Sequence, residues 1–121
     1  MGVERKRSRI IIATNNRNRM ENLRAICQVS FEVLETNCGQ AALDLLDTYG
    51  LGISALLLDF SEDAAGGWDA MEKIRQSGFT ELVPVVGIMK DIELDKLDRA
   101  LSLGVSDILQ EPFYPRLVKR R

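Results

Sequence analysis

The sequence predicts an α/β domain in which one doubly wound parallel sheet carries helices on both faces. Short apolar runs rich in β-branched residues alternate along the chain with segments of helical periodicity. The chain has 121 residues, of which 45% are apolar, and this is enough for one hydrophobic core. Strict alternation of strands and helices favours parallel strands joined by right-handed crossovers.

Five apolar runs are the predicted strands. The first contains three consecutive isoleucines and the third reads ALLLD, so both suit a strand that is buried on its two faces. Glycine, proline or polar residues separate each run from the next helical segment. The predicted strands span Ile10–Thr14, Phe31–Glu35, Ala55–Asp59, Pro84–Met89 and Asp107–Leu109.

Four amphipathic helices are predicted between these strands, and a fifth begins after Pro112. In each, apolar residues recur every three or four positions. The second helix ends at Gly50 and the fourth at Gly104, because glycine commonly follows a helix C-terminus. The predicted buried faces are Met20, Leu23 and Cys27; Ala42, Leu45 and Leu46; Trp68, Met71 and Ile74; and Leu94, Leu97 and Leu101.

The composition excludes several classes of function. Sixteen basic residues stand against eighteen acidic ones, and this near balance argues against binding of nucleic acid or membrane by this domain. The chain has no histidine, which removes Ser-His-Asp and Cys-His catalysis and histidine-ligated zinc. Cys27 and Cys38 lack metal or redox spacing and are predicted to be buried free thiols. Without a signal core or a membrane-length apolar run, we expect a cytoplasmic protein.

In a doubly wound sheet, ligands bind beyond the carboxyl ends of the strands, where the strand order reverses. Asp59 is the one ionisable residue that an apolar strand carries to this edge. A carboxylate there can be a metal ligand, a general base or a nucleophile toward phosphorus, and it can also simply cap a helix or a turn. No glycine-rich phosphate loop follows the first strand, which ends in Thr14, Asn15 and Asn16. The two asparagines are predicted to cap the first helix and to form its turn.

From Arg9 to Leu117 the chain resembles a response-regulator receiver domain, with the motifs in the family's order and spacing. GQAALDLL (39–46) is similar to the family's second helix and AMEKIR (70–75) to its third. PVVGIMK (84–90) and GVSDILQEPF (104–113) stand where the family has Pro-Val-Ile-x-Leu-Thr-Ala and Gly-Ala-x-Asp-Tyr-Leu-x-Lys-Pro-Phe. The resemblance implies a flavodoxin-like five-stranded sheet of order 2-1-3-4-5.

The resemblance also assigns roles to positions at the strand ends. Asp59 stands at the phospho-acceptor position, with Gly67 eight residues on as in the family. The family's first strand ends in two acids that help to hold Mg²⁺, and Thr14 and Asn15 occupy those positions here. Magnesium in proteins is usually held by one or two carboxylates, so this pair is degenerate as a metal site.

The positions that sense the phosphoryl group in the family are changed as well. Met89 replaces the switch hydroxyl, Ile108 replaces the switch aromatic, and Glu111 replaces the lysine that binds the phosphoryl oxygen. Methionine cannot hydrogen-bond a phosphoryl oxygen with its side chain as a hydroxyl does. Glu111 would face Asp59, and two like charges about 4 Å apart repel by about 4 kcal/mol at an effective dielectric constant of about 20. Of five functional features, only the acceptor is kept.

These losses predict a pseudo-receiver, a non-enzymatic regulatory or dimerisation module that works without phosphorylation, with no cofactor expected. The alternative is a working receiver phosphorylated on Asp59 through an atypical Mg²⁺ site. Its ligands would be Asp59, Ser61 and Asn15, or a substitute set in which Glu62, Asp63 and Glu111 surround Asp59. A small enzyme on the same frame is a third possibility, but no nucleophile–base pair or cofactor motif supports it.

The resemblance implies a protein partner, or a second copy, on the face formed by the fourth helix, fifth strand and fifth helix. The candidate residues of this face are Asp91, Glu93, Asp95, Lys96, Asp98, Arg99 and Asp107. Residues 1–8 are predicted to be a basic tail and residues 9–121 the receiver-like domain. YPRLVKRR (114–121) ends in mid-helix, and we expect the helix to continue into a covalently linked output domain. PFYPRLVKRR is similar to junctions that lead into diguanylate cyclase domains.

Overall fold

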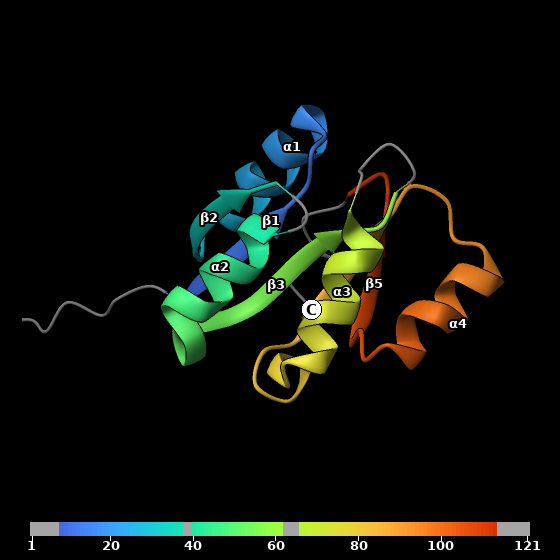
Figure 1. Ribbon diagram of the computed structural model, residues 1–121. Coiled ribbons are helices and arrows are strands. Elements are labelled where there is room, and N and C mark those ends of the chain that lie inside the picture. The colour runs from blue at the N-terminus through green and yellow to red at the C-terminus, as the bar shows by residue number, and fades with distance from the viewer. Residues whose placement is uncertain (1–7, 38–39, 62–65, 114–121) are drawn as a thin grey trace, which may run out of the picture.

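A computed structural model describes residues 8–37, 40–61 and 66–113 of the chain. The strands form one parallel sheet of order β2-β1-β3-β4-β5 (Figure 1). This confirms the predicted fold class and strand order, and the predicted strand boundaries differ by one or two residues. The strands are β1 (Arg9–Ala13), β2 (Glu32–Thr36), β3 (Ile53–Asp59), β4 (Val85–Met89) and β5 (Asp107–Gln110).

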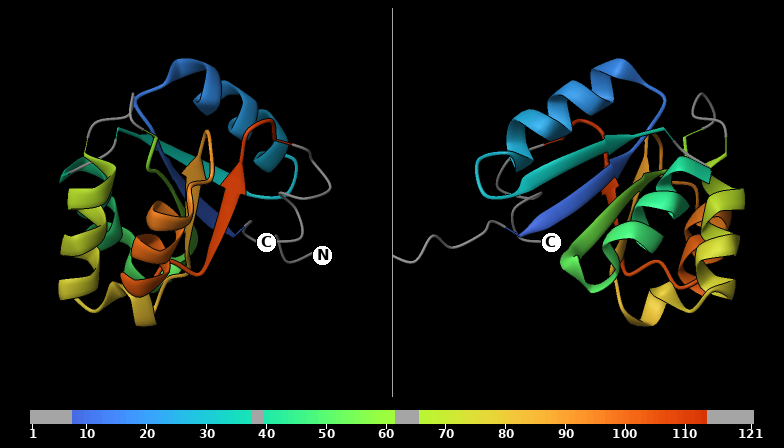
Figure 2. Two further views of the ribbon diagram at one scale, coloured as in Figure 1. Left: turned by 90° about the vertical axis from the view of Figure 1, so that its right-hand side faces the viewer. Right: turned by 60° about the vertical axis from the view of Figure 1, so that its left-hand side comes forward.

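The described helices cover the two faces of the sheet unequally. Helix α1 lies on one face, while α2, α3 and α4 lie on the other (Figure 2). The predicted fifth helix and most of the basic N-terminal tail lie outside the described residues. The helices are α1 (Arg17–Cys27), α2 (Gln40–Tyr49), α3 (Gly67–Gln76) and α4 (Leu94–Ser102), with short 3₁₀ turns η1 (Gly50–Gly52) and η2 (Phe79–Glu81). No helix in the described ranges is long and apolar enough to span a membrane.

Alternate residues of the central strands enter two separate apolar cores. Ile11 of β1 faces α2 and α3 and packs in one core, whereas Ile10 and Ile12 face α1 and pack in the other. The three isoleucines are almost fully buried, as expected for a parallel strand covered on both sides. Cys27 of α1 packs in the second of these cores. Burial raises the pKa of its thiol to about 11. The prediction of a buried free thiol is confirmed for Cys27, while Cys38 lies outside the described residues.

The predicted buried face of α4 is wrong for Leu94 and Leu101, whereas Leu97 is partly buried as expected. Leu94 is 76% exposed and Leu101 is 49% exposed, whereas Ala100 is fully buried. Lys96, Leu97 and Leu103 are partly buried on the same side as Ala100, following the three-to-four-residue period of a helix. Leucine identity alone misled the prediction, because the side of α4 that packs against the core carries the small residue Ala100.

Two glycines bring the start of α3 close to the end of β3. Gly66 is the N-cap of α3 and has a left-handed backbone with a φ of 96°. A Cβ on Gly67 would lie 2.1 Å from the carbonyl oxygen of Asp59, which is too close for any side chain. The Gly-Gly pair therefore lets the helix begin directly against the strand end that carries Asp59.

Candidate site at the carboxyl end of the sheet

Asp59 is the last residue of β3, and its side chain is completely buried. Both of its carboxylate oxygens are engaged. Oδ2 accepts a hydrogen bond from the Thr14 hydroxyl at 2.6 Å, and Oδ1 accepts one from the backbone N–H of Ser61 at 2.8 Å. Thr14 and Ser61 thus hold the carboxylate from the ends of β1 and β3. The structure brings the predicted acceptor position and one of the predicted acidic-pair positions into direct contact.

Arg19, which was not predicted from the sequence, completes this site. Arg19 of α1 donates to Asp59 Oδ2 from Nη1 at 3.2 Å, and its Nε donates to Oε1 of Glu111. The Arg19 side chain is only 5% exposed, and that of Glu111 is 30% exposed. One guanidinium therefore joins two carboxylates that come from β3 and from the turn after β5. We call Arg19, Asp59 and Glu111 the arginine cluster.

Local structure at the start of α1 positions Arg19. Asn16 is the N-cap of α1, and its side chain accepts a hydrogen bond from the Arg19 backbone N–H at 3.0 Å. The Thr14 hydroxyl accepts from the Asn16 N–H at 3.1 Å, which ties the cap to the end of β1. The predicted capping role is confirmed for Asn16. The first turn of α1 contains no acidic residue.

A cation near a helix N-terminus is electrostatically unfavourable, because the amide dipoles leave partial positive charge there. Arg19 nevertheless lies buried in the first turn of α1, opposite two carboxylates. The carboxylates supply the charge that offsets both the helix dipole and the loss of hydration. The first turn of α1 contains basic residues but no acidic residue. This was the one sequence signal that could have indicated an acidic partner for Arg19 elsewhere in the chain.

The predicted repulsion between Glu111 and Asp59 is corrected by this arrangement. Glu111 does reach the neighbourhood of Asp59, but the guanidinium of Arg19 contacts both groups. The Asp59 and Glu111 carboxylates were expected to repel each other directly. Instead, the guanidinium of Arg19 joins them. Glu111, at the predicted lysine position, is thus paired with a cation supplied by α1.

The site does not fit Mg²⁺. Asp59 is the one carboxylate among Thr14, Asn15 and Asp59, and its oxygens already accept hydrogen bonds from three groups. In the described part of the chain, no group of three histidine, cysteine, aspartate or glutamate side chains is placed to hold a metal ion. Glu62 and Asp63, proposed as substitute ligands, lie outside the described residues.

The two switch positions are packed as ordinary apolar residues. Met89 is 2% exposed and belongs to the core beneath α2 and α3. Ile108 is partly buried against the same core, and its Cδ1 lies beside Gly87, where a Cβ would approach it to 2.9 Å. Phe60 fills the space next to Gly87 and stacks on Trp68, with ring centroids 4.4 Å apart. This side of the sheet end therefore contains apolar packing at both predicted switch positions.

Several of the predicted partner-face residues interact with other residues of the domain. The Arg99 guanidinium lies 4.4 Å from the centre of the Trp68 ring, so it reaches across to α3. Lys96 and Glu93 form an ion pair at 3.8 Å. Asp107 accepts a hydrogen bond from the backbone N–H of Ile108. Several of the charges assigned to partner binding are thus engaged within the domain.

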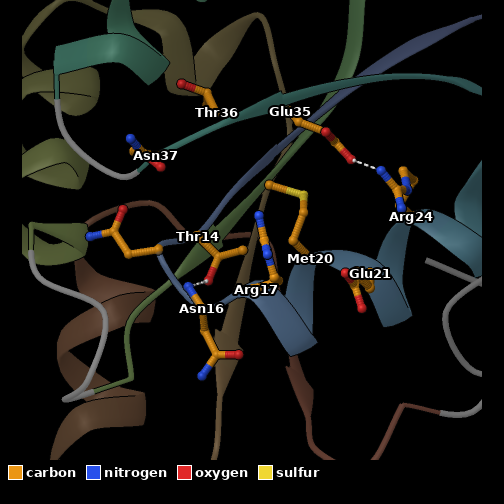
Figure 3. A pocket seen from close by; sticks show the side chains of 10 residues that line it. Thr14, Asn16, Arg17, Met20, Glu21, Arg24, Glu35, Thr36 and Asn37 are labelled. Atoms are coloured by element: carbon orange, nitrogen blue, oxygen red, sulfur yellow. Dashed lines mark hydrogen bonds and ion pairs between the residues drawn. The ribbon is translucent and has the colours of Figure 1, made fainter.

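A polar cleft of about 590 Å³ lies beside the arginine cluster, between the start of α1 and the end of β2 (Figure 3). Its wall includes an ion pair between Arg24 and Glu35 at 2.7 Å, which links α1 to β2. Thr14 is shared between the cleft and the Asp59 site, whereas Arg19, Asp59 and Glu111 do not line it. The other lining residues are Asn15, Asn16, Arg17, Met20, Glu21, Thr36 and Asn37.

Comparison with known proteins gives relatives that are response regulators. The chain is 30% identical over 96 residues to response regulator SaeR of Staphylococcus epidermidis, across 75% of this chain and 40% of SaeR. It is 27% identical over 90 residues to the rice two-component response regulator ORR5, across 74% of this chain and 66% of ORR5. The chain therefore spans about two fifths of the length of SaeR. No family model matches the chain.

Solved structures share the fold at low sequence identity. Chemotaxis protein CheY4 of Vibrio cholerae superposes with a TM-score of 0.83 at 14% identity, covering 94% of both chains. The beryllofluoride-activated DrrB receiver domain gives 0.77 at 17% identity, covering 94% of this chain and 96% of that one. A two-component response regulator/GGDEF domain protein gives 0.76 at 21% identity, covering 93% of this chain and 46% of that one. The chain thus has the fold of receiver (CheY-like) domains, with an aspartate at the end of β3, and three quarters of it is similar in sequence to a response regulator.

Proposed function

We propose that this domain is a pseudo-receiver, a regulatory module of a signal-transduction protein that works without phosphorylation of Asp59. The observation that carries the proposal is the arginine cluster. Arg19 supplies, from within the fold, the positive charge that the acceptor carboxylate would otherwise receive from a metal ion and a lysine. Asp59 is therefore paired with a cation in the absence of any ligand.

The geometry around Asp59 opposes phosphoryl transfer. Phosphoryl transfer depends on positioning and on stabilising the charge of the transferred group. Here the acceptor oxygens are buried and are bonded to Thr14, Ser61 and Arg19. A phosphoryl group would have to displace Arg19 from Asp59 and would bring its negative charge toward Glu111. The working-receiver alternative requires both changes.

The surface around α4 is where we place the partner of this module. Ile92, Leu94 and Leu101 are 41%, 76% and 49% exposed, a concentration of exposed large apolar side chains near one helix. A protein partner or a second copy of the domain would cover them, in contact with α4 and β5. The relatives' greater length and the GGDEF-containing neighbour support a covalently linked output domain as the recipient of the signal.

The proposal is tested by amide NMR of the ¹⁵N-labelled domain, titrated first with Mg²⁺ and then with beryllofluoride, which imitates a phosphoryl group on aspartate. Trp68 lies next to Phe60 and provides a fluorescence signal for the same titration. Fluoride alone and Mg²⁺ alone are the matched controls. We expect no saturable change at the amides of Asn15, Asp59, Ser61, Met89 and Glu111.

Saturable shifts at those amides with beryllofluoride and Mg²⁺ would favour the working receiver and overturn the pseudo-receiver proposal. The partner surface is tested separately by sedimentation of the wild type and of a Leu94→Lys, Leu101→Lys variant. A dimer that dissociates in the variant supports self-association through α4. An unchanged dimer would place the interface elsewhere.

A further inference from the structure

Helix α4 turns its less apolar side toward the core. Of its residues, all of which the structure describes, Ala100 alone is buried, and the side chain of Lys96 on the same side is 29% exposed. Leu94 and Leu101, in contrast, are 76% and 49% exposed. Leucine is commonly buried and lysine rarely is. The described position of α4 is therefore not the one that its apolar side chains alone would favour.

A second position of α4 follows from the geometry of a helix. Successive residues of an α-helix are about 100° apart around its axis. A rotation of α4 by one such step would bring Leu101 to the place of Ala100. The same step would bring Leu97 to the place of Lys96. Leucines would then face the core and the lysine would face water, in agreement with the apolar period of the sequence.

The packing beneath α4 leaves room for a larger apolar side chain. A cavity of about 290 Å³ lies between β3, β4 and the start of α4, and its wall includes Phe60, Met89 and Lys96. Apolar side chains beside a cavity lack the contacts that a close-packed neighbour would give them. In the rotated position, Leu97 would adjoin this cavity in place of the lysine.

The contact between Arg99 and Trp68 opposes this rotation. The Arg99 guanidinium of α4 lies 4.4 Å from the centre of the Trp68 ring of α3. Trp68 in turn stacks on Phe60, directly after β3, with ring centroids 4.4 Å apart. Rotation of α4 by one residue would carry the guanidinium away from the ring. The cation–π contact therefore stabilises the described position and not the rotated one.

The two ends of α4 are held differently. After its C-terminal end, Gly104 has a left-handed backbone with a φ of 99°, and the next residue, Val105, is buried. At its start, the N-cap Glu93 makes no side-chain hydrogen bond to the first turn, and Leu94 is exposed. Residues at the ends of an element can absorb the dihedral changes of a movement. The start of α4 is thus held less firmly than its end, as a rotation requires.

We propose that α4 has two positions related by a rotation of about 100°, and that the Arg99–Trp68 contact favours the described one. The described position exposes Leu101, and the rotated position buries it. The two positions would be a binding and a non-binding form of the surface that we assign to the partner, a consequence that rests on the proposed function. A partner that binds only the described position shifts the equilibrium toward it.

The test is ¹⁵N relaxation dispersion of the domain, which detects exchange with a minor position on the microsecond-to-millisecond timescale. Arg99→Gln should raise the population of the rotated position about threefold, with dispersion at the amides of Leu97, Ala100 and Leu101. Adding Leu101→Gln should lower that population about tenfold, because residue 101 is buried only in the rotated position. Glutamine has nearly the helix propensity of leucine. Arg17→Gln is the matched control, because Arg17 is an exposed arginine of α1, on the other face of the sheet.

Three results would overturn the inference. The first is flat dispersion across α4 in Arg99→Gln, and the second is an equal change in Arg17→Gln. The third is dispersion that persists unchanged when Leu101→Gln is added, since this would indicate fraying of the helix and not rotation. The samples contain no Mg²⁺ or beryllofluoride, so failure here is separate from failure of the pseudo-receiver proposal. The sedimentation test of the partner surface is likewise independent of it.

Discussion

The two sides of the Asp59 strand end differ in how their polar groups are satisfied. On the α1 side, Arg19 joins Asp59 and Glu111, and the acceptor oxygens are fully engaged. On the α4 side, the Ser61 hydroxyl lacks a partner, the start of α4 has no side-chain cap, and Leu94 is largely exposed. The polar groups of one side are satisfied by the protein itself, whereas the other side leaves the apolar side chain of Leu94 exposed.

This difference separates the acceptor site from the proposed partner surface, two regions that phosphorylation of Asp59 would otherwise couple. A closed acceptor site stabilises a single arrangement of α1, β3 and the turn after β5. An open β4–α4 side leaves room for regulation by contacts there. Under the pseudo-receiver proposal, the same fold keeps a recognition surface without chemistry at its acceptor.

Arg19→Met should give the largest effect on the closed side. The variant leaves Asp59 buried without its cation, and breaking a buried ion pair by removing one partner costs about 3–5 kcal/mol. Urea unfolding followed by circular dichroism measures this loss. Arg24→Met on the same helix is the matched control, because the Arg24–Glu35 pair is exposed and should change stability by about 0.5 kcal/mol or less. Equal losses in the two variants would contradict a structural role for the arginine cluster.

Gly67→Ala should come next, because it forces the start of α3 away from the end of β3. The new Cβ would meet the carbonyl oxygen of Asp59 at 2.1 Å, and backbone cannot move aside as a side chain can. We expect a loss of about 3 kcal/mol, the upper part of the usual range for overpacking. Gly52→Ala is the control, since no atom lies within 4 Å of its added Cβ. Unfolding free energies that match in the two variants would refute the close approach.

Glu111→Gln should have a smaller effect than Arg19→Met. Glu111 is partly exposed, and Arg19 keeps its contact with Asp59 when the glutamate is neutralised. We expect a loss of about 1 kcal/mol in the free energy of unfolding. Glu35→Gln, from the exposed Arg24 pair, is the comparison variant. A loss for Glu111→Gln as large as that for Arg19→Met would mean that Glu111, rather than Asp59, is the main partner of the guanidinium.

Leu94→Lys should have the smallest effect on stability, because the side chain is already 76% exposed on the open side. We expect a change within about 0.5 kcal/mol for the monomer, as for other surface substitutions. Thermal unfolding at low protein concentration measures it. A large loss of stability at low concentration would show that α4 packs Leu94 against the domain after all.

Local patterns predicted the fold well because each strand and helix is encoded by its own periodicity. The burial of the isoleucines of β1 and the capping role of Asn16 follow from neighbouring residues, whereas the strand order came from the resemblance to receiver domains. Arg19 was not predicted, because its partners lie 40 and 92 residues away and no local pattern joins them. The face of α4 was mispredicted for a related reason: its rotation depends on the tertiary packing of Ala100, not on where the leucines occur.

The side-chain NMR signal of the Arg19 Nε–Hε group tests the central claim most directly. If Arg19 bridges Asp59 and Glu111, this signal should exchange slowly with water and stay in place when Mg²⁺ and beryllofluoride are added. The exposed Arg24 guanidinium provides the fast-exchanging reference in the same spectrum. An Arg19 signal that exchanges as fast as that of Arg24, or that moves saturably when the two ligands are added, would contradict a closed acceptor site.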